Sequence, residues 1–263
     1  MQEDIPNGDI TTNLTIPNNQ KITARIIAKD QGIVCGIKIA KEVFLMIDKK
    51  LIIRTQLQDG ANIKSNQTIL TIKGNKKSIL KAERTALNFL GLMSGISTKT
   101  NEFAQLVKKY QCKICCTRKT LPNLRNLQKY AVTMGGGINN RMNLSDEIFI
   151  KDNHIVNNEL GTLISNVIKK NKGKKIITVE VDNLKQLKKI ITFKINRVLF
   201  DNMSPMNIKK GIKLLPKNVE TEASGNINKS TIISYAKSGV QRISMGALTH
   251  SIENFDFSLE IKN

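Results

Sequence analysis

The sequence predicts an α/β protein in which a small antiparallel sheet precedes a barrel of parallel strands. Short strand-like segments separated by glycine-containing turns occupy residues 1–75, a pattern typical of antiparallel pairing. After residue 110, apolar strand-like runs alternate with helical patterns, and from residue 147 they recur about every 20–30 residues. Repeated strand–helix units place their strands parallel, and such strands commonly close into a barrel.

The first segments are expected to form strands, with two helices after them. The strand-like pieces read KITARIIAKD, GIVCGIKI, LIIRTQ and NQTILTIKG. A helix is predicted from about Ser78, a suitable N-cap, and a second helix over about residues 99–110. The first helix has an apolar stripe at helical spacing, made of Ile79, Ala82, Ala86, Leu90 and Met93.

The later segments alternate between the two kinds of element. Helical patterns ELGTLISNVIKK, NLKQLKKI, PMNIKKGIKLL and STIISYAKS separate the later strands. An open, doubly wound sheet is the structural alternative, but no Gly-x-Gly-x-x-Gly follows a first strand, which argues against a dinucleotide-binding fold. The expected strands span residues 112–117, 147–151, 176–181, 197–201, 219–224 and 240–245.

Composition narrows the class of protein. The 263 residues are 40% apolar, enough to bury a core, and no run approaches the roughly 18 apolar residues of a membrane span. The polar start MQEDIPNGDITTN does not resemble a signal peptide. The net charge of +21 raises nucleic-acid binding as an alternative, but the lysines are spread along the chain and aromatic residues make up only 4%.

The basic residues are 34 lysines and only 8 arginines. Because lysine serves wherever a positive surface residue suffices, the retained arginines mark positions where the planar guanidinium is needed. Three of them, Arg84, Arg118 and Arg141, lie in segments that carry candidate site residues.

The four cysteines are expected to be reduced. Cys112, Cys115 and Cys116 lie in CKICC, and Cys35 stands apart. A Cys-x-x-Cys pair is compatible with a redox or metal site, but no second pair accompanies it. We therefore expect thiols packed as small hydrophobic side chains in a cytoplasmic protein.

Polar residues end several of the predicted parallel strands, and in a barrel those ends share one face. Cations there would bind carboxylates and phosphates, two acids suit Mg²⁺, and two glycine-containing loops suit a phosphate. This predicts two polyanionic substrates, at least one of them phosphorylated. The residues are Thr117, Arg118, Lys119, Lys151, Glu180, Asp201, Ser224, Gly225, Asn226, Met245, Gly246 and Ala247, joined by Arg141 from the loop GGGINNR.

Acid–base chemistry of the glycoside hydrolase kind is a further alternative for Glu180 and Asp201. Four nearby cations are expected to depress the pKa of both carboxyls, which argues against a general acid.

The segment TRKTLPNLRNLQKYAVTMGGGINNRMNLSDEIFIKDNH resembles the central signature of the quinolinate phosphoribosyltransferase family. EDIPNGDITT, ERTALNFLGLMSGIST, VEVDNL, LFDNMSP, EASGNIN and RISMGALTHS are similar to other motifs of that family, in the same order. The resemblance covers nearly the whole chain.

The resemblance implies an N-terminal α/β sandwich and an incomplete, seven-stranded α/β barrel. We place the sandwich at residues 1–108, rejoined by residues 250–263, and the barrel at residues 109–249. The implied reaction joins quinolinate to 5-phosphoribosyl-1-diphosphate with Mg²⁺ as cofactor. It yields nicotinate mononucleotide, pyrophosphate and CO₂ in NAD biosynthesis. The implied working unit is a homodimer, with no nucleic-acid or membrane partner.

The resemblance also implies residue roles. Arg84 of one protomer would enter the partner's site. Arg118, Lys119 and Arg141 would bind quinolinate carboxylates, with Lys119 and Lys151 approaching the phosphoribosyl donor. Lys119, Glu180 and Asp201 are the expected catalytic residues, and Glu180 and Asp201 would lie near the ribose and Mg²⁺. The loops 224–226 and 245–247 would contact phosphate.

The sequence departs from the family pattern at two points. The family usually carries a further helix before the acidic segment that begins here at Glu3, and Asn140 stands where its GGGxNHR pattern has histidine. Asn140 is still expected to contact the substrate, but it offers a neutral amide instead of a cationic donor. A paralogous transferase associated with molybdenum use and a binding-only relic remain alternatives. His154 is expected to contact substrate or to support a residue that does, and His250 is expected to be structural.

Overall fold

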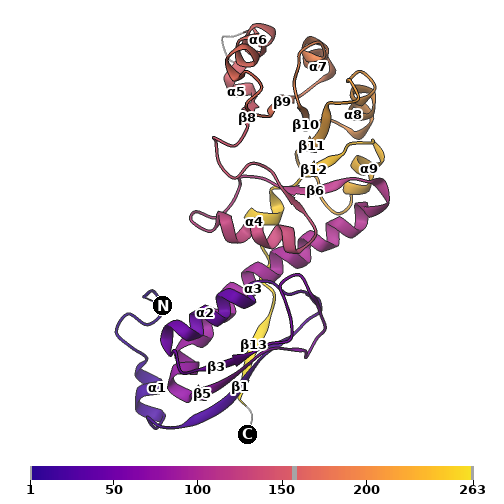
Figure 1. Cartoon of the computed structure of the whole chain (residues 1–263). Coiled ribbons are helices and arrows are strands. Elements are labelled where there is room, and N and C mark those ends of the chain that lie inside the picture. Colours follow the sequence, from indigo (N-terminus) through magenta and orange to yellow (C-terminus); the bar gives the residue numbers. More distant parts are fainter. Residues whose placement is uncertain (1, 156–158, 262–263) are drawn as a thin grey trace. The chain divides into compact units, whose positions relative to one another are not determined.

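The computed structural model describes residues 2–155 and 159–261 (Figure 1). In this part of the chain no helix is long and apolar enough to cross a membrane. The chain divides into two compact units. The sheet unit comprises Met1–Asn101, Tyr130–Gly135 and Ser251–Asn263, and the barrel unit comprises Glu102–Lys129 and Gly136–His250.

The sheet unit is built on an antiparallel sheet with the strand order β13-β1-β5-β3. Its last strand comes from the end of the chain, where Phe257 pairs with Ala28 at one end of the register and Ile261 with Ala24 at the other. A two-stranded pair, β2 with β4, accompanies it. The strands are β1 (Lys21–Ala28), β2 (Gly32–Ile33), β3 (Ile52–Arg54), β4 (Asn62–Ile63), β5 (Thr68–Asn75) and β13 (Phe257–Ile261).

Helices α2 (Ile37–Ile47) and α3 (Lys76–Val107) cover one face of this sheet (Figure 1). Alternate residues of the central strands point to these helices, as the period of two in a strand requires. Burial of this one face makes a two-layer α/β sandwich, as the resemblance implies. The shared core contains Ala24, Ile26, Phe44, Leu70, Ile72, Ile79, Ala82, Ala86, Leu90 and Phe257.

Three local expectations for the sheet unit are wrong. GIVCGIKI is only briefly a strand, because Gly36 with φ of 98° turns the chain and α2 begins at Ile37. The two helices predicted over 78–110 are one helix, α3, continued by a 3-10 turn at Lys108–Tyr110. That helix begins at Lys76, and Asn75 Oδ1 accepts the amide of Ser78 at 3.2 Å, so Asn75 provides the cap. A short helix α1 (Ile10–Thr15) was not predicted.

The barrel unit contains seven parallel strands in the order β7-β6-β12-β11-β10-β9-β8. The last strand of the barrel unit, β12, pairs in parallel with its first strand, β6. The strand pairings leave β7 and β8 as the two edges, so the barrel is incomplete between them. The strands are β6 (Lys113–Cys116), β7 (Ile138–Asn139), β8 (Ile148–Ile150), β9 (Ile177–Val181), β10 (Arg197–Asp201), β11 (Glu220–Ser224) and β12 (Arg242–Ser244).

This arrangement confirms the predicted barrel of parallel strands and excludes the doubly wound alternative. The seventh strand, β7, was missed because only two residues of GGGINNR pair with β6. The four predicted helical patterns correspond to α6 (Leu160–Asn171), α7 (Leu184–Ile190), α8 (Pro205–Ile212) and α9 (Ile232–Lys237). Helices α4 (Arg125–Met134), α5 (Asp152–Ile155) and α10 (Ala247–His250) complete the order.

Charged side chains occupy the barrel interior where aliphatic residues are usual. Arg197 Nε lies 2.7 Å from Glu220 Oε2, and its Nη1 lies 3.3 Å from Glu147 Oε2. Arg242 Nε lies 3.4 Å from Oε2 of the fully buried Glu222. Burial alone would raise the pKa of Glu220, but hydrogen bonds and charges from Arg197 and Arg242 hold it below the ordinary value. We call these five residues the interior ion network.

Removal of one arginine from this network should destabilise the barrel unit strongly. Arg197→Met would leave the buried carboxylate of Glu147 without its cation, at a cost of about 3–5 kcal/mol in the free energy of unfolding. Chemical denaturation measures the change. Lys229→Met, which breaks an exposed pair with Glu102 in the same unit, is the control and should cost no more than about 1 kcal/mol. Equal losses in the two variants would contradict a stabilising network.

Candidate active site

One cavity of about 640 Å³ opens at the carboxyl ends of the barrel strands. All of its lining residues belong to the barrel unit. They include the fourteen site residues predicted from that unit's strand ends and from GGGINNR: Thr117, Arg118, Lys119, Asn140, Arg141, Lys151, Glu180, Asp201, Ser224, Gly225, Asn226, Met245, Gly246 and Ala247.

Residues after β6 supply two cations to the cavity. The turn is fixed by Thr117, whose Oγ1 accepts the amide of Lys119 at 3.1 Å, and by Thr249, whose Oγ1 donates to the Lys119 carbonyl at 2.7 Å. The Arg118 Nε is buried and has no hydrogen-bond acceptor in the described part of the chain. A buried guanidinium donor without a partner is suited to an anionic ligand.

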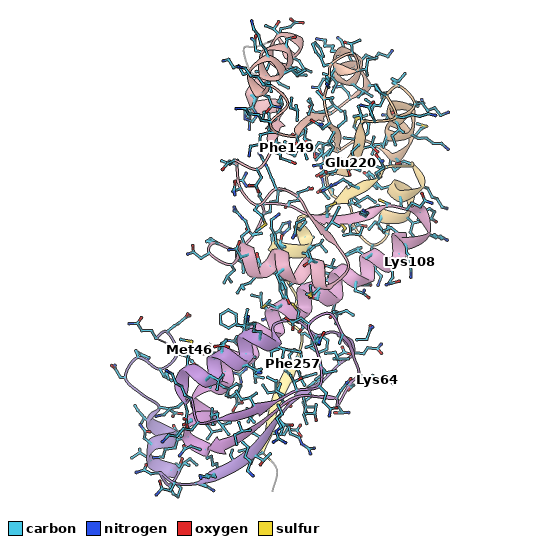
Figure 2. The ribbon with its side chains drawn as sticks, in the orientation of Figure 1. Met46, Lys64, Lys108, Phe149, Glu220 and Phe257 are labelled. Carbon is cyan, nitrogen blue, oxygen red and sulfur yellow. The ribbon has the colours of Figure 1, made fainter. Side chains whose placement is uncertain are left out.

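Two further cations lie close to the ring of Phe149, on β8 beside the barrel opening (Figure 2). The Arg141 guanidinium lies 4.8 Å and the Lys151 ammonium 5.1 Å from the centre of the Phe149 ring. Burial and the neighbouring charge of Arg118 lower the pKa of Arg141, yet a guanidinium remains protonated. The mutual repulsion of the cations is relieved when a multiply charged anion enters.

Glu180 from β9 and Asp201 from β10 are the cavity's candidate metal ligands. The Glu180 Oε2 lies 3.2 Å from Lys151 Nζ, and Asp201 Oδ2 accepts from Asn202 Nδ2 at 2.7 Å. Burial raises the pKa of Glu180, and Lys151 opposes this only in part, while the charges of Asp201 and Asp152 add to it. The expectation that nearby cations depress this pKa is therefore wrong, because desolvation outweighs them.

The loop after β11 presents backbone and small polar groups to the cavity. Gly225 has φ of 98°, and a Cβ there would lie 2.2 Å from Asn202 Oδ1, so the close approach of the two loops requires glycine. The Asn202 amide donates to the Ser224 carbonyl at 3.0 Å, and Asn226 Nδ2 donates to Asn202 Oδ1 at 3.3 Å. These bonds hold 224–226 against the end of β10.

The loop after β12 is held against β6. The Met245 amide donates to the Cys115 carbonyl at 2.9 Å, and the Gly246 carbonyl accepts the amide of His250 at 3.1 Å. A Cβ on Gly246 would lie 3.1 Å from Lys119 Cδ, so glycine leaves room for that lysine.

The amide of Asn140 is directed into the interior ion network. Its Nδ2 donates to Glu222 Oε1 and to Ser244 Oγ, each at 2.8 Å, and its Oδ1 accepts from Arg242. Asn140 therefore lines the cavity and is also hydrogen-bonded to Glu222 and Arg242 of the interior ion network.

Two predicted residues lie outside this cavity. Arg84 is exposed on α3 in the sheet unit. His154, on α5, accepts the Lys151 amide through Nδ1 at 3.0 Å, which places it behind that lysine.

Several lining residues were not predicted: Phe149, Leu199, Asn202, Glu222, Ile227, Ser244 and His250. Most of them are apolar or lie within strands, so no signal in the sequence set them apart. His250 was expected to be structural, but it lines the cavity.

The cysteines behave as expected. All four are buried and unpaired, and burial raises the pKa of Cys35 and of Cys112 to about 12. Among the described residues, no group of three or more histidine, cysteine, aspartate or glutamate side chains is placed to hold a metal ion. This does not conflict with Mg²⁺, which proteins bind through one or two carboxylates together with substrate phosphates.

Comparison with known proteins agrees with these features. Family models for the N-terminal and C-terminal domains of quinolinate phosphoribosyl transferase match residues 9–94 and 96–260. A probable nicotinate-nucleotide pyrophosphorylase (carboxylating) of Bacillus subtilis is 38% identical, with 98% of this chain and 90% of the relative covered.

Solved structures agree as well. The nicotinate-nucleotide pyrophosphorylase of Francisella tularensis is 39% identical with a TM-score of 0.94, covering 99% of this chain and 92% of that one. The enzyme of Ehrlichia chaffeensis is 36% identical with the same TM-score, covering 99% and 95%. The chain therefore belongs to the quinolinate phosphoribosyltransferase family.

Proposed function

We propose that this chain transfers the phosphoribosyl group of 5-phosphoribosyl-1-diphosphate to quinolinate. The products are nicotinate mononucleotide, pyrophosphate and CO₂, in the biosynthesis of NAD. The observation that carries the proposal is one cavity that brings together four cations, two acids and two glycine-containing loops in a member of this family. The unpaired, buried cysteines support a reducing compartment, the cytoplasm.

Quinolinate is a dianion with two adjacent carboxylates. Arg118 and Arg141 can bind these carboxylates in bidentate fashion, with Lys119 between the two substrates. Such contacts hold the pyridine nitrogen in register with the donor, so orientation supplies part of the rate enhancement. The loops 224–226 and 245–247 would hold the phosphate of the donor through backbone amides.

Mg²⁺ bound by Glu180 and Asp201 together with the diphosphate would neutralise charge on the departing pyrophosphate. The pyridine nitrogen attacks C1′ of the ribose while the bond from C1′ to the pyrophosphate oxygen breaks. Positive charge builds at C1′, and the carboxylates of Glu180 and Asp201 stabilise it. Lys151, paired with Glu180, would keep that carboxylate ionised and also approach the donor.

Decarboxylation follows from the same charge. Once alkylated, the nitrogen makes the ring a cationic electron sink. The bond from the ring to the carboxylate beside the nitrogen then breaks. Its electron pair stays on the ring carbon, CO₂ leaves, and the ring carbon takes a proton from water.

Turnover with different acceptors tests this function. We expect quinolinate to be converted with Mg²⁺ and the donor. Nicotinate should be a poor acceptor, because it lacks the second of the two carboxylates that Arg118 and Arg141 are proposed to bind. A preference for another acceptor would favour the molybdenum-associated paralogue. No turnover with any acceptor would favour a binding-only relic.

Two single substitutions test the assigned charges. Lys119→Ala and Glu180→Ala should each lower turnover by about a hundredfold or more, since each removes a charged partner of the transition state. Steady-state kinetics with quinolinate measures the loss. Near-wild-type turnover in either variant would remove that residue from the active site.

A homodimer with shared sites is part of the proposal, with Arg84 entering the partner's cavity. The exposed position of Arg84 on α3 and its absence from the lining of its own chain's cavity support this role. Separate Arg84→Ala and Lys119→Ala proteins should each be nearly inactive. Mixed in equal amounts and refolded together, they should recover about a quarter of wild-type activity, because half of the dimers then contain one complete site. No recovery, despite dimers of mixed composition, would contradict sharing.

A further inference from the structure

Helix α4 contains two cations that do not line the cavity but contact the segment that carries Arg141. Lys129 is 1% exposed, which makes it one of the largest fully buried side chains in the described part of the chain. Burial of an ammonium is costly unless hydrogen bonds compensate it. Lys129 is the one lysine among the described residues that is fully buried, so its position requires a specific reason.

The compensation comes from main-chain carbonyls. Lys129 Nζ donates to the Asn140 carbonyl at 2.6 Å and to the Arg141 carbonyl at 3.0 Å. Arg125 Nη1 donates to the next carbonyl, that of Met142, at 3.0 Å. Arg125 and Lys129 stand four residues apart, on one face of α4, so the helix holds three successive carbonyls.

The segment held in this way needs support. It follows β7, one of the two edge strands, and the ladder of strand hydrogen bonds does not continue across the barrel opening to β8. The backbone of 140–142 therefore takes its position from side chains. The Arg125 Nε also donates to Thr120 Oγ1 at 3.0 Å, which anchors the arginine itself.

Because these carbonyls are held, the Cα of Arg141 and the direction of its side chain are held as well. Its guanidinium donates to the Glu147 carbonyl at 3.3 Å and lies over Phe149, so the side chain is held at its tip as well as at its base. We propose that Arg125 and Lys129 form a carbonyl clamp that positions Arg141 for the acceptor carboxylate. They are positioning residues that do not touch substrate, and the acceptor assignment rests on the function proposed above.

If the clamp positions Arg141, its loss should weaken the binding of the acceptor much more than that of the donor. Calorimetric titration with quinolinate and steady-state kinetics of the full-length protein measure the two effects. Lys129→Met should weaken quinolinate binding by at least about tenfold, as loss of charged hydrogen bonds to a positioned segment implies. The KM for 5-phosphoribosyl-1-diphosphate should change by less than about threefold. Lys237→Met, which removes an exposed lysine on α9, should leave both unchanged.

Arg125 provides a second test, should Lys129→Met fail to fold. Arg125 is only partly buried, so its variants should fold. Arg125→Met should weaken quinolinate binding several-fold, and Arg125→Lys, which keeps a donor for the Met142 carbonyl, should bind within about twofold of wild type. Equal quinolinate binding by wild type and the folded variants would overturn the clamp.

A double-mutant cycle separates positioning from general destabilisation. In an Arg141→Ala background, Lys129→Met or Arg125→Met should have little further effect on quinolinate binding, because the clamp residues act on binding only through the Arg141 side chain. An effect as large as in the wild-type background would overturn the clamp while leaving the proposed function intact. Absence of quinolinate binding by the wild-type chain would instead overturn the proposed function, and the acceptor role of the clamp with it.

Discussion

The interior ion network of the barrel is the constraint on which the site depends. Arg197 on β10 and Arg242 on β12 both pair with glutamates of β11, the strand that lies between theirs in the parallel sheet. The register of β10 and β11 places Asp201 beside Ser224 at the cavity. Asn140 and Ser244 contact Glu222, so the network also forms the floor of the cavity. The charged network thus lies directly beneath the strand ends that line the cavity.

Above this floor, the cavity concentrates like charges. Arg118, Lys119, Arg141 and Lys151 would repel one another in an empty site, and other groups hold them in place. Two of them lie over the ring of Phe149, and Lys129 of α4 donates to the backbone carbonyl of Arg141. Such preorganisation suits polyanionic substrates, whose binding relieves the repulsion between the cations and orients the substrates.

Most residues of the cavity could be predicted from the sequence, because strand ends in parallel barrels share a face and the polar residues there stood out against apolar runs. The side-chain contacts within the barrel could not be predicted in this way. Arg197 and Arg242 are the first residues of their strands, and no motif indicated that they would be buried. Lys129 was one lysine among 34. The two-residue β7 had no periodicity to detect, and the pKa of Glu180 depends on burial that no motif encodes.

The scarcity of arginine was informative, since six of the eight arginines belong to the cavity, the clamp, the interior ion network or the proposed dimer contact.

The most direct measurement of the central claim is the product stoichiometry with quinolinate labelled in the carboxylate beside the ring nitrogen. The purified chain is supplied with 5-phosphoribosyl-1-diphosphate and Mg²⁺, and labelled CO₂, pyrophosphate and nicotinate mononucleotide are quantified together. We expect all three products to form in equal amounts. Pyrophosphate released without CO₂, or quinolinate left unchanged by protein that binds it, would contradict the proposed transfer and decarboxylation.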